Sequence, residues 1–259
     1  MDPSTFAGIG LALVAIFMSM IMEGGNPAAL IAPSSLLLVF GGTIGVMVAG
    51  VLMKDAKGFV GVFKAALMPK VAEPDEAIGT VVQFAEKARR QGLLALEEDA
   101  RKVEDPFLRK GIELAVDGTD PEELREILEN EIAAMKGRHK AGAKMFADMG
   151  GFAPTMGIIG TVLGLIHVLN NLSDPSKLGP LISAAFTATL WGVLTANVFW
   201  LPMSNKLKRS SEMEVHRMEL LVEGIISIQA GANPRVVEQR LLSYLSPKQR
   251  ASAEQDKAA

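Results

Sequence analysis

The stretch GGFAPTMGIIGTVLGLIHVL, residues 150–169, contains no Asp, Glu, Lys or Arg and is long enough to cross a bilayer. A hydrocarbon core of roughly 30 Å needs about 20 apolar residues in a helix. Small residues recur in this stretch with a 4-3-4 spacing, which places them on one helical stripe. They are Ala153, Gly157, Gly160 and Gly164. Such a stripe lets a neighbouring backbone approach closely, so we predict a membrane helix that packs against other helices.

Three further segments share this apolar character, and His167 is the only ionisable side chain in the whole set. The predicted spans are residues 3–22, 28–53, 149–172 and 178–204. We therefore predict an all-α membrane protein with four transmembrane helices and a helical cytoplasmic domain. The expected organisation is transmembrane helices 1 and 2 in 1–53, the cytoplasmic domain in 54–148, transmembrane helices 3 and 4 in 149–204, and cytoplasmic C-terminal helices and tail in 205–259.

The composition argues against several classes of protein. The absence of cysteine excludes disulfide scaffolds, thiolate metal sites and cysteine nucleophiles. The three histidines show no ligand spacing, so we expect no metal site and no cofactor. No nucleophile and base pair can be assembled, so we expect no enzyme activity. The net charge of -3 gives no indication of a nucleic-acid partner.

The basic residues indicate how the chain is oriented. Of the 26 Lys and Arg, 16 lie in residues 54–144, 9 lie in residues 206–259, and one, Lys177, lies in the loop 171–179. Because cytoplasmic loops carry the excess of positive charge, we expect the segment 54–148 and both termini to be cytoplasmic. The opening MDPST has no basic residue, so we expect the first span to be retained rather than removed as a signal peptide.

The cytoplasmic segments are predicted to be helical. Asp120, followed by Pro121 and two glutamates, has the residue types that start a helix. Few helix breakers follow, so one helix is expected to run from there into the third span. Other helices are predicted at about 76–90, 96–116 and 235–245, and the helix of the tail is expected to end at Gly231.

Two prolines, Pro154 and Pro202, fall on the cytoplasmic side of the third and fourth spans. A proline removes one backbone hydrogen bond and kinks a helix or marks a hinge, so the pair could gate a path between the helices. The alternative is that proline is simply commoner in membrane helices. The spacing leaves both interpretations open.

Two threonines could project into whatever these helices enclose. Thr189 lies on a small-residue stripe of the fourth span with Ala185, Gly192 and Ala196, and Thr161 flanks the stripe of the third. A hydroxyl can contact a hydrated ion or a carboxyl group. The alternative is a hydroxyl bonded to the i-4 carbonyl of its own helix.

The predicted spans contain no carboxylate, although an ion carrier normally holds an ionisable group at membrane depth. His167 lies near the outer end of the third span, where a loop-facing role is favoured. If these helices guide ions, the carboxylate should come from another chain.

Three stretches carry a resemblance to a known family: APTMGIIGTVLGLI at 153–166, TLWGVLTANVFWLP at 189–202 and ARRQGLLALEED at 88–99. With the two-plus-two order of spans, they resemble the flagellar motor stator A subunit, the MotA/PomA family of the MotA/TolQ/ExbB superfamily. The third and fourth spans alone are also similar to TolQ and ExbB, which have three spans in a different order.

The resemblance implies an ion-conducting stator subunit, surrounded by membrane lipids in the bacterial cytoplasmic (inner) membrane, that couples H+ or Na+ flow to rotation. It implies a homopentamer around a dimer of a B subunit (MotB/PomB-like), which supplies the ion-binding aspartate, and torque on the rotor protein FliG. The resemblance assigns roles to eight residues: gating to Pro154 and Pro202, the ion path to Thr161 and Thr189, and rotor contact to Arg89, Arg90, Glu97 and Glu98.

Other interpretations stay open at this point. The four loop charges also fit a solvated helix face. The chain could serve a Tol/Ton-type energy-transducing complex, or be a self-contained secondary transporter. The sequence does not identify the ion, although two hydroxyls favour a sodium-capable site slightly.

Overall fold

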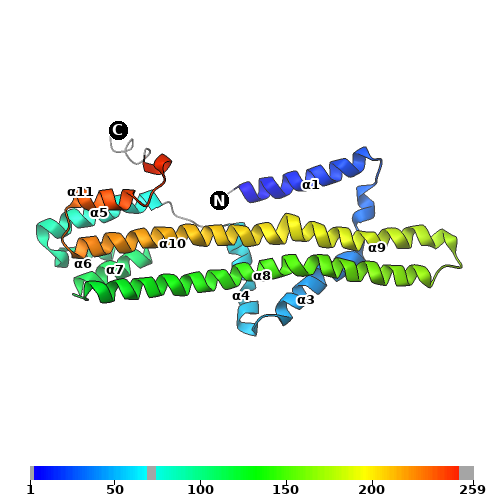
Figure 1. Cartoon of the computed structure of the whole chain (residues 1–259), viewed down its shortest axis with the longest axis horizontal. Helices are drawn as coiled ribbons and strands as arrows, with labels where there is room; N and C mark the ends of the chain where they lie inside the picture. The colour runs from blue at the N-terminus through cyan, green and yellow to red at the C-terminus, as the bar shows by residue number, and fades with distance from the viewer. Residues whose placement is uncertain (1–2, 69–73, 251–259) are drawn as a thin grey trace. The chain divides into compact units, whose positions relative to one another are not determined.

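The computed structural model describes residues 3–68 and 74–250, and every regular element in these ranges is helical (Figure 1). The all-α fold class is therefore confirmed. The chain divides into two compact units. The first unit comprises Met1–Lys70 and His139–Arg209, and the second comprises Val71–Arg138 and Ser210–Ala259.

Within the described residues, three helices are long and apolar enough to cross a membrane: α1 (Ser4–Met22), α8 (Pro121–Leu169) and the continuous helix Pro175–Gln229. The last of these combines α9 (Pro175–Thr195), a π-helical turn η4 (Ala196–Trp200) and α10 (Leu201–Gln229). As expected, α8 starts at Pro121 and continues without a break into the third predicted span, 149–172, where it ends at Leu169.

The second predicted span, 28–53, is divided into shorter pieces. They are η1 (Pro27–Leu30), α2 (Pro33–Leu36), the π-helical turn η2 (Leu37–Gly41) and α3 (Gly42–Ala49). Proline cannot donate a backbone hydrogen bond, so Pro27 and Pro33 each start a new helix. The apolar run Pro33–Ala49 is about 25 Å long at helical rise, shorter than a typical hydrocarbon core. A fourth membrane span remains a prediction.

An aromatic cluster attaches α4 (Met53–Leu67) to the first unit. Phe59 and Phe63 stack on Phe146 of α8, with ring centroids 5.4 Å and 6.1 Å away. Phe146 in turn lies 6.2 Å from Trp200. Because of this packing, the first unit includes a helix that the charge pattern assigns to the cytoplasmic segment 54–148.

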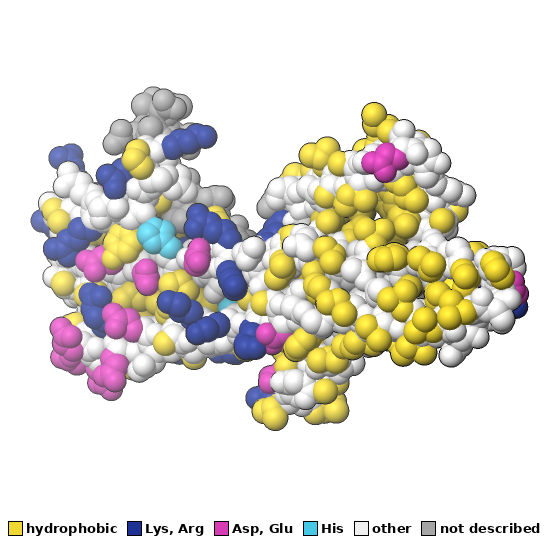
Figure 2. Space-filling model, turned by 45° about the vertical axis from the view of Figure 1, so that its right-hand side comes forward, with side chains coloured by type: hydrophobic (Ala, Val, Ile, Leu, Met, Phe, Trp, Pro, Cys, Tyr) yellow, Lys and Arg dark blue, Asp and Glu magenta, His cyan; other side chains and the backbone are white. Residues whose placement is uncertain are grey.

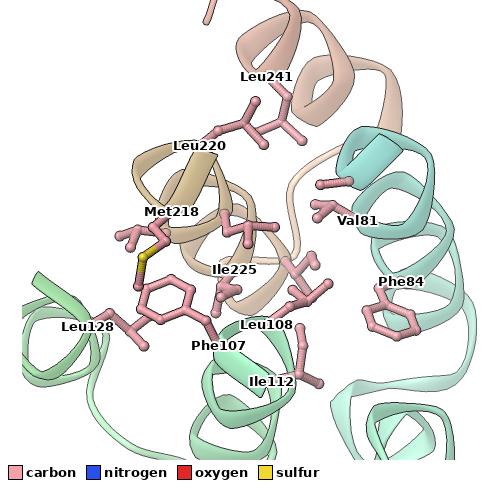
Figure 3. Packing of buried hydrophobic residues seen from close by; sticks show 14 of the residues in the cluster. Val81, Phe84, Phe107, Leu108, Ile112, Leu128, Met218, Leu220, Ile225 and Leu241 are labelled. Atoms are coloured by element: carbon pink, nitrogen blue, oxygen red, sulfur yellow. The ribbon is translucent and has the colours of Figure 1, made fainter. Parts of the chain in front are cut away.

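The second unit has a well-packed apolar core. It contains α5 (Pro74–Gln91), η3 (Leu93–Leu96), α6 (Glu97–Ala100), α7 (Pro106–Val116), α11 (Pro234–Leu242) and the adjoining parts of α8 and α10. Figure 3 shows Val81, Ile112, Leu128, Ile225 and Leu241 directed toward one another from five of these helices.

The helix predicted at 96–116 is wrong as a single element. It is interrupted at 101–105, because Asp105 caps a new helix: its side chain accepts hydrogen bonds from the backbone N–H groups of Phe107 and Leu108, at 2.8 Å and 3.0 Å. Pro106 occupies the first position of that helix.

The surfaces of the two units differ in character. Figure 2 shows hydrophobic side chains gathered over the first unit and charged side chains over the second. On α1, large apolar side chains are turned outward, among them Leu11 and Met22, which are 72% and 82% exposed. An apolar surface of this size is typical of contact with lipid or with neighbouring subunits.

Candidate functional site: the α8–α9 helix pair

The predicted small-residue stripe is the packing surface between α8 and α9. A Cβ atom added to Gly157 would lie 2.9 Å from the carbonyl oxygen of Ala188. A Cβ added to Gly192 would lie 2.6 Å from the carbonyl oxygen of Ala153. Because these neighbours are backbone atoms, the two helices can approach this closely only where both lack side chains.

This packing brings Thr161 and Thr189 together. Their hydroxyl groups form a hydrogen bond with each other across the helix pair. The Thr161 hydroxyl also lies 3.2 Å from the carbonyl oxygen of Ala185, and the Thr189 hydroxyl lies 3.4 Å from that of Gly157. Each threonine thus reaches the backbone of the opposite helix, and two hydroxyl and two carbonyl oxygens form one cluster. We call these four groups the oxygen cluster.

The alternative interpretation, in which a threonine hydroxyl bonds to a carbonyl of its own helix, holds in part for Thr161 and fully for two other threonines. Thr161 lies 3.2 Å from its i-4 carbonyl at Gly157, and a single hydroxyl proton can serve only one of its acceptors at a time. Thr187 and Thr195 donate to the i-4 carbonyls of Ser183 and Trp191, at 2.8 Å and 2.7 Å. These two threonines are buried and bonded within α9, which sets them apart from the oxygen cluster.

Pro154 and Pro202 lie on these same two helical segments but not at the same level. Gly150 packs against Leu201, and Gly157 packs against Gly192, so Pro202 lies nearer the level of Gly150 than that of Pro154. At about 1.5 Å per residue, the two prolines are staggered by roughly 7 Å along the helix axes. Both remain at the same end of the helix pair.

The backbone accommodates the two prolines differently. Pro154 lies inside the regular helix α8, whereas Pro202 comes two residues after the π-helical turn η4. A proline leaves the carbonyl four residues earlier without its usual donor, and a widened turn is one way to relieve that clash. The sequence offered no signal for η4, because π turns have no residue signature of their own.

The four charges predicted to contact a rotor lie on the surface of the second unit. Arg89 and Arg90 lie in the last turn of α5, Gly92 turns the chain with a φ of 85°, and Glu97 and Glu98 begin α6. All four side chains are exposed. Glu97 forms an ion pair with Arg101 at 2.7 Å.

A neighbouring ion pair holds α5 and α6 together. Lys87 Nζ lies 2.7 Å from Asp99 Oδ2. This hydrogen bond, helped by the positive charges of Lys87 and Lys102, holds the pKa of Asp99 below its usual value. This shift keeps Asp99 ionised, and so paired with Lys87, down to a lower pH than an unperturbed aspartate.

Two long-range hydrogen bonds that the sequence did not indicate fasten the divided segment 27–49 to α9. Trp191 Nε1 donates to the carbonyl oxygen of Leu30 at 2.7 Å, and the Ser35 hydroxyl donates to that of Ala184 at 3.3 Å. Behind Ser35 lies a cavity of about 430 Å³ that His167 also lines.

No group of three or more His, Asp or Glu that could hold a metal occurs in residues 3–68 and 74–250.

Comparison with known proteins places this arrangement in a family. Residues 6–92 match the model of the motility protein A N-terminal region, and residues 99–220 match that of the MotA/TolQ/ExbB proton channel family. Motility protein A of Bacillus subtilis (strain 168) is 42% identical over 100% of this chain and 96% of its own length. Chemotaxis protein PomA of Vibrio alginolyticus is 36% identical over 97% and 98%.

Solved structures agree over nearly the whole chain. The flagellar MotAB stator complex from Bacillus subtilis superposes with a TM-score of 0.90 at 41% identity, covering 96% of this chain and 98% of that one. The C. jejuni MotAB structure gives 0.92 at 35% identity, covering 95% and 97%. The family and the apolar helices indicate a membrane location. The chain belongs to the motility protein A group of the MotA/TolQ/ExbB proton channel family.

Proposed function

We propose that this chain is the ion-conducting stator subunit of a bacterial flagellar motor, in the cytoplasmic membrane. The oxygen cluster between α8 and α9 is the observation that carries the proposal: it places four uncharged oxygen atoms between two helices whose backbones pack closely at Gly157 and Gly192. Oxygen ligands of this kind suit a hydrated alkali cation or a proton-bearing carboxyl group. The similarity to proteins named motility protein A and to stator structures supports the same function.

The ion-binding carboxylate is proposed to come from a B subunit. Neither α1 nor the stretch 149–204 contains an Asp or Glu outside the short loop 171–177. The similar solved structures are described as MotAB, which supports a two-component complex. In this proposal several copies of the chain surround the B-subunit helices. The resemblance to the stator family implies five copies. Ion binding and release then drive the ring of A subunits stepwise around them.

The identity of the ion is tested by its removal. Rotation of cells carrying this chain and its B partner should be recorded with sodium, with sodium replaced by potassium, and with a protonophore present. Loss of rotation on removing sodium alone identifies a sodium stator, and loss only with the protonophore identifies a proton stator. Rotation that survives both treatments together would contradict the proposed function.

The two threonines of the oxygen cluster should control ion flow. Replacing both by valine, Thr161→Val with Thr189→Val, keeps the shape but removes both hydroxyls. Because a hydrogen bond to a charged group contributes about 1.5–3 kcal/mol, we expect ion flux into cells or vesicles to fall at least about tenfold. The matched control is Thr187→Val, whose hydroxyl bonds within its own helix, and it should leave the flux nearly unchanged. Equal flux in all three proteins would rule out a role for the cluster.

The exposed charges Arg90 and Glu98 are proposed to steer docking onto the rotor protein FliG. Charges at an interface act mainly on recognition and encounter, and placing like charges opposite each other is unfavourable. We expect Arg90→Glu or Glu98→Lys to reduce swimming speed by roughly half or more, with normal amounts of the protein in the membrane. Lys136→Glu, an exposed charge reversal on α8, serves as the control. Unchanged torque in both loop variants would show that these charges belong to a solvated face.

A further inference from the structure

A second cavity in the first unit, of about 440 Å³, lies between the start of α1 and the junction of η4 with α10. At one end it is lined by Ser4 and Thr5 of α1 and by Lys206 and Arg209 of α10. Thr5 and Lys206 are joined by a hydrogen bond between the hydroxyl and the ammonium group, so this end of the cavity is fixed across the two helices.

Apart from Asn197, the remainder of the cavity is lined by apolar residues and glycine. One to two helical turns further along α1 its wall is formed by Gly8, Ile9 and Ala12, and the facing wall is formed by Asn197, Val198, Pro202 and Met203. A Cβ atom added to Gly8 would meet no atom within 4 Å, so this wall is open. The cavity therefore changes along the helices from a cationic, hydroxyl-bearing end to an apolar groove.

Its position coincides with a predicted membrane boundary. The apolar helix α1 starts at Ser4, and Lys206 is the first charged residue after the apolar stretch that ends α9 and continues through η4. The Thr5–Lys206 contact places these two points at the same level. By the distribution of Lys and Arg this is the cytoplasmic boundary, where the lipid leaflet is anionic and basic pockets between membrane helices suit anionic headgroups.

We propose that this cavity binds an anionic phospholipid, with its phosphate at Lys206 and Arg209 and an acyl chain along the groove beside Gly8. Lys206 and Arg209 make other polar contacts as well, but each carries several N–H donors, and with the hydroxyls of Ser4 and Thr5 they form an end of the cavity that can contact a phosphate. A soluble phosphate would leave the apolar groove unused, whereas a lipid occupies both parts. The proposal requires only a membrane location and holds whichever ion the stator conducts.

The test is native mass spectrometry of the full-length chain, in the oligomer in which it is purified, titrated in detergent with phosphatidylglycerol or phosphatidylcholine. Lys206→Gln with Arg209→Gln removes the cationic end; Lys208→Gln with Lys54→Gln removes two charges that do not line the cavity. Gly8→Leu fills the groove. Gly10→Leu is its control: a Cβ added at Gly10 also meets no atom within 4 Å, and Gly10 lies on α1 but does not line the cavity.

We expect the unchanged chain and both controls to retain phosphatidylglycerol in preference to phosphatidylcholine. At about 1 kcal/mol for each basic residue, the Lys206/Arg209 variant should bind phosphatidylglycerol roughly 30-fold more weakly, and Gly8→Leu should also lose it. Equal retention by the Lys206/Arg209 variant and its control would overturn the proposal. So would full displacement by millimolar inorganic phosphate, which would indicate a simple phosphate site. A Gly8→Leu chain that loses its oligomeric mass while still holding lipid would identify the groove as a contact between copies.

Discussion

Gly192→Leu is expected to abolish swimming and to lower the melting temperature of the purified chain in detergent by roughly 10 °C. Even a methyl group at this position would lie 2.6 Å from the carbonyl oxygen of Ala153 and 3.1 Å from the Cα of Gly157. Backbone atoms cannot turn aside as side chains do, so α8 and α9 must separate. Overpacking a close contact typically costs about 1–3 kcal/mol, and more when backbone has to move.

The separation should also disperse the oxygen cluster, because Thr189 lies less than one turn from Gly192. Melting is followed by circular dichroism, and swimming by tracking cells that carry the variant. Gly179→Leu is the matched control: it places the same side chain on α9 where no atom lies within 4 Å of the added Cβ. A Gly192→Leu chain that melts together with this control would show that the helices are not held at the observed distance.

Asp105→Ala should strongly destabilise the second unit. Asp105 caps α7, and its other carboxylate oxygen lies 2.5 Å from Arg217 Nη1. The two side chains are only 15% and 18% exposed. Losing the cap costs about 1 kcal/mol, and leaving a largely buried guanidinium without its partner costs about 3 kcal/mol or more. We expect the free energy of unfolding of this unit to fall by about 4 kcal/mol, measured by urea denaturation of the full chain.

Two variants separate these contributions. Asp105→Asn keeps a good capping residue and removes the charge, so it should be about 1 kcal/mol less destabilising than Asp105→Ala. Lys110→Ala removes one partner of the exposed ion pair with Glu131, in which the side chains are 48% and 37% exposed, and should cost less than about 1 kcal/mol. If Lys110→Ala were as damaging as Asp105→Ala, burial would not be what makes the Asp105 pair important.

The sequence could predict whatever depends on local residue type. Asp120 and Pro121 mark the start of α8, and positions 157 and 160 show the stripe along which that helix packs. The pairing of Thr161 with Thr189 could be suspected because each lies on or beside such a stripe. Packing periodicity is encoded every three or four residues, so a single sequence is enough to find it.

The rest depends on contacts between residues far apart in the chain. The capping role of Asp105 is visible in its neighbour Pro106, but its partner Arg217 is more than a hundred residues away. The segment 28–53 looks like a continuous apolar helix, yet Trp191 donates a hydrogen bond to the carbonyl oxygen of Leu30, the residue at which the short 3-10 helix η1 ends. Hydropathy measures transfer into lipid and does not detect a hydrogen bond that ends a helix.

The π-helical turn at 196–200 changes the angular position, around the helix axis, of every side chain that follows it. In an uninterrupted α-helix, positions twelve residues apart differ in azimuth by about 120°, and positions eleven apart by about 20°. The turn absorbs one extra residue, so Gly192 and Ser204, twelve positions apart, both face α8. Gly192 touches the backbone there, and the Ser204 hydroxyl donates to the carbonyl oxygen of Ala143 at 2.8 Å. Deleting one residue inside the turn would keep Gly192 and Ser204 on the same side of the helix. Deleting one residue between the turn and either Gly192 or Ser204 would rotate that residue away from α8.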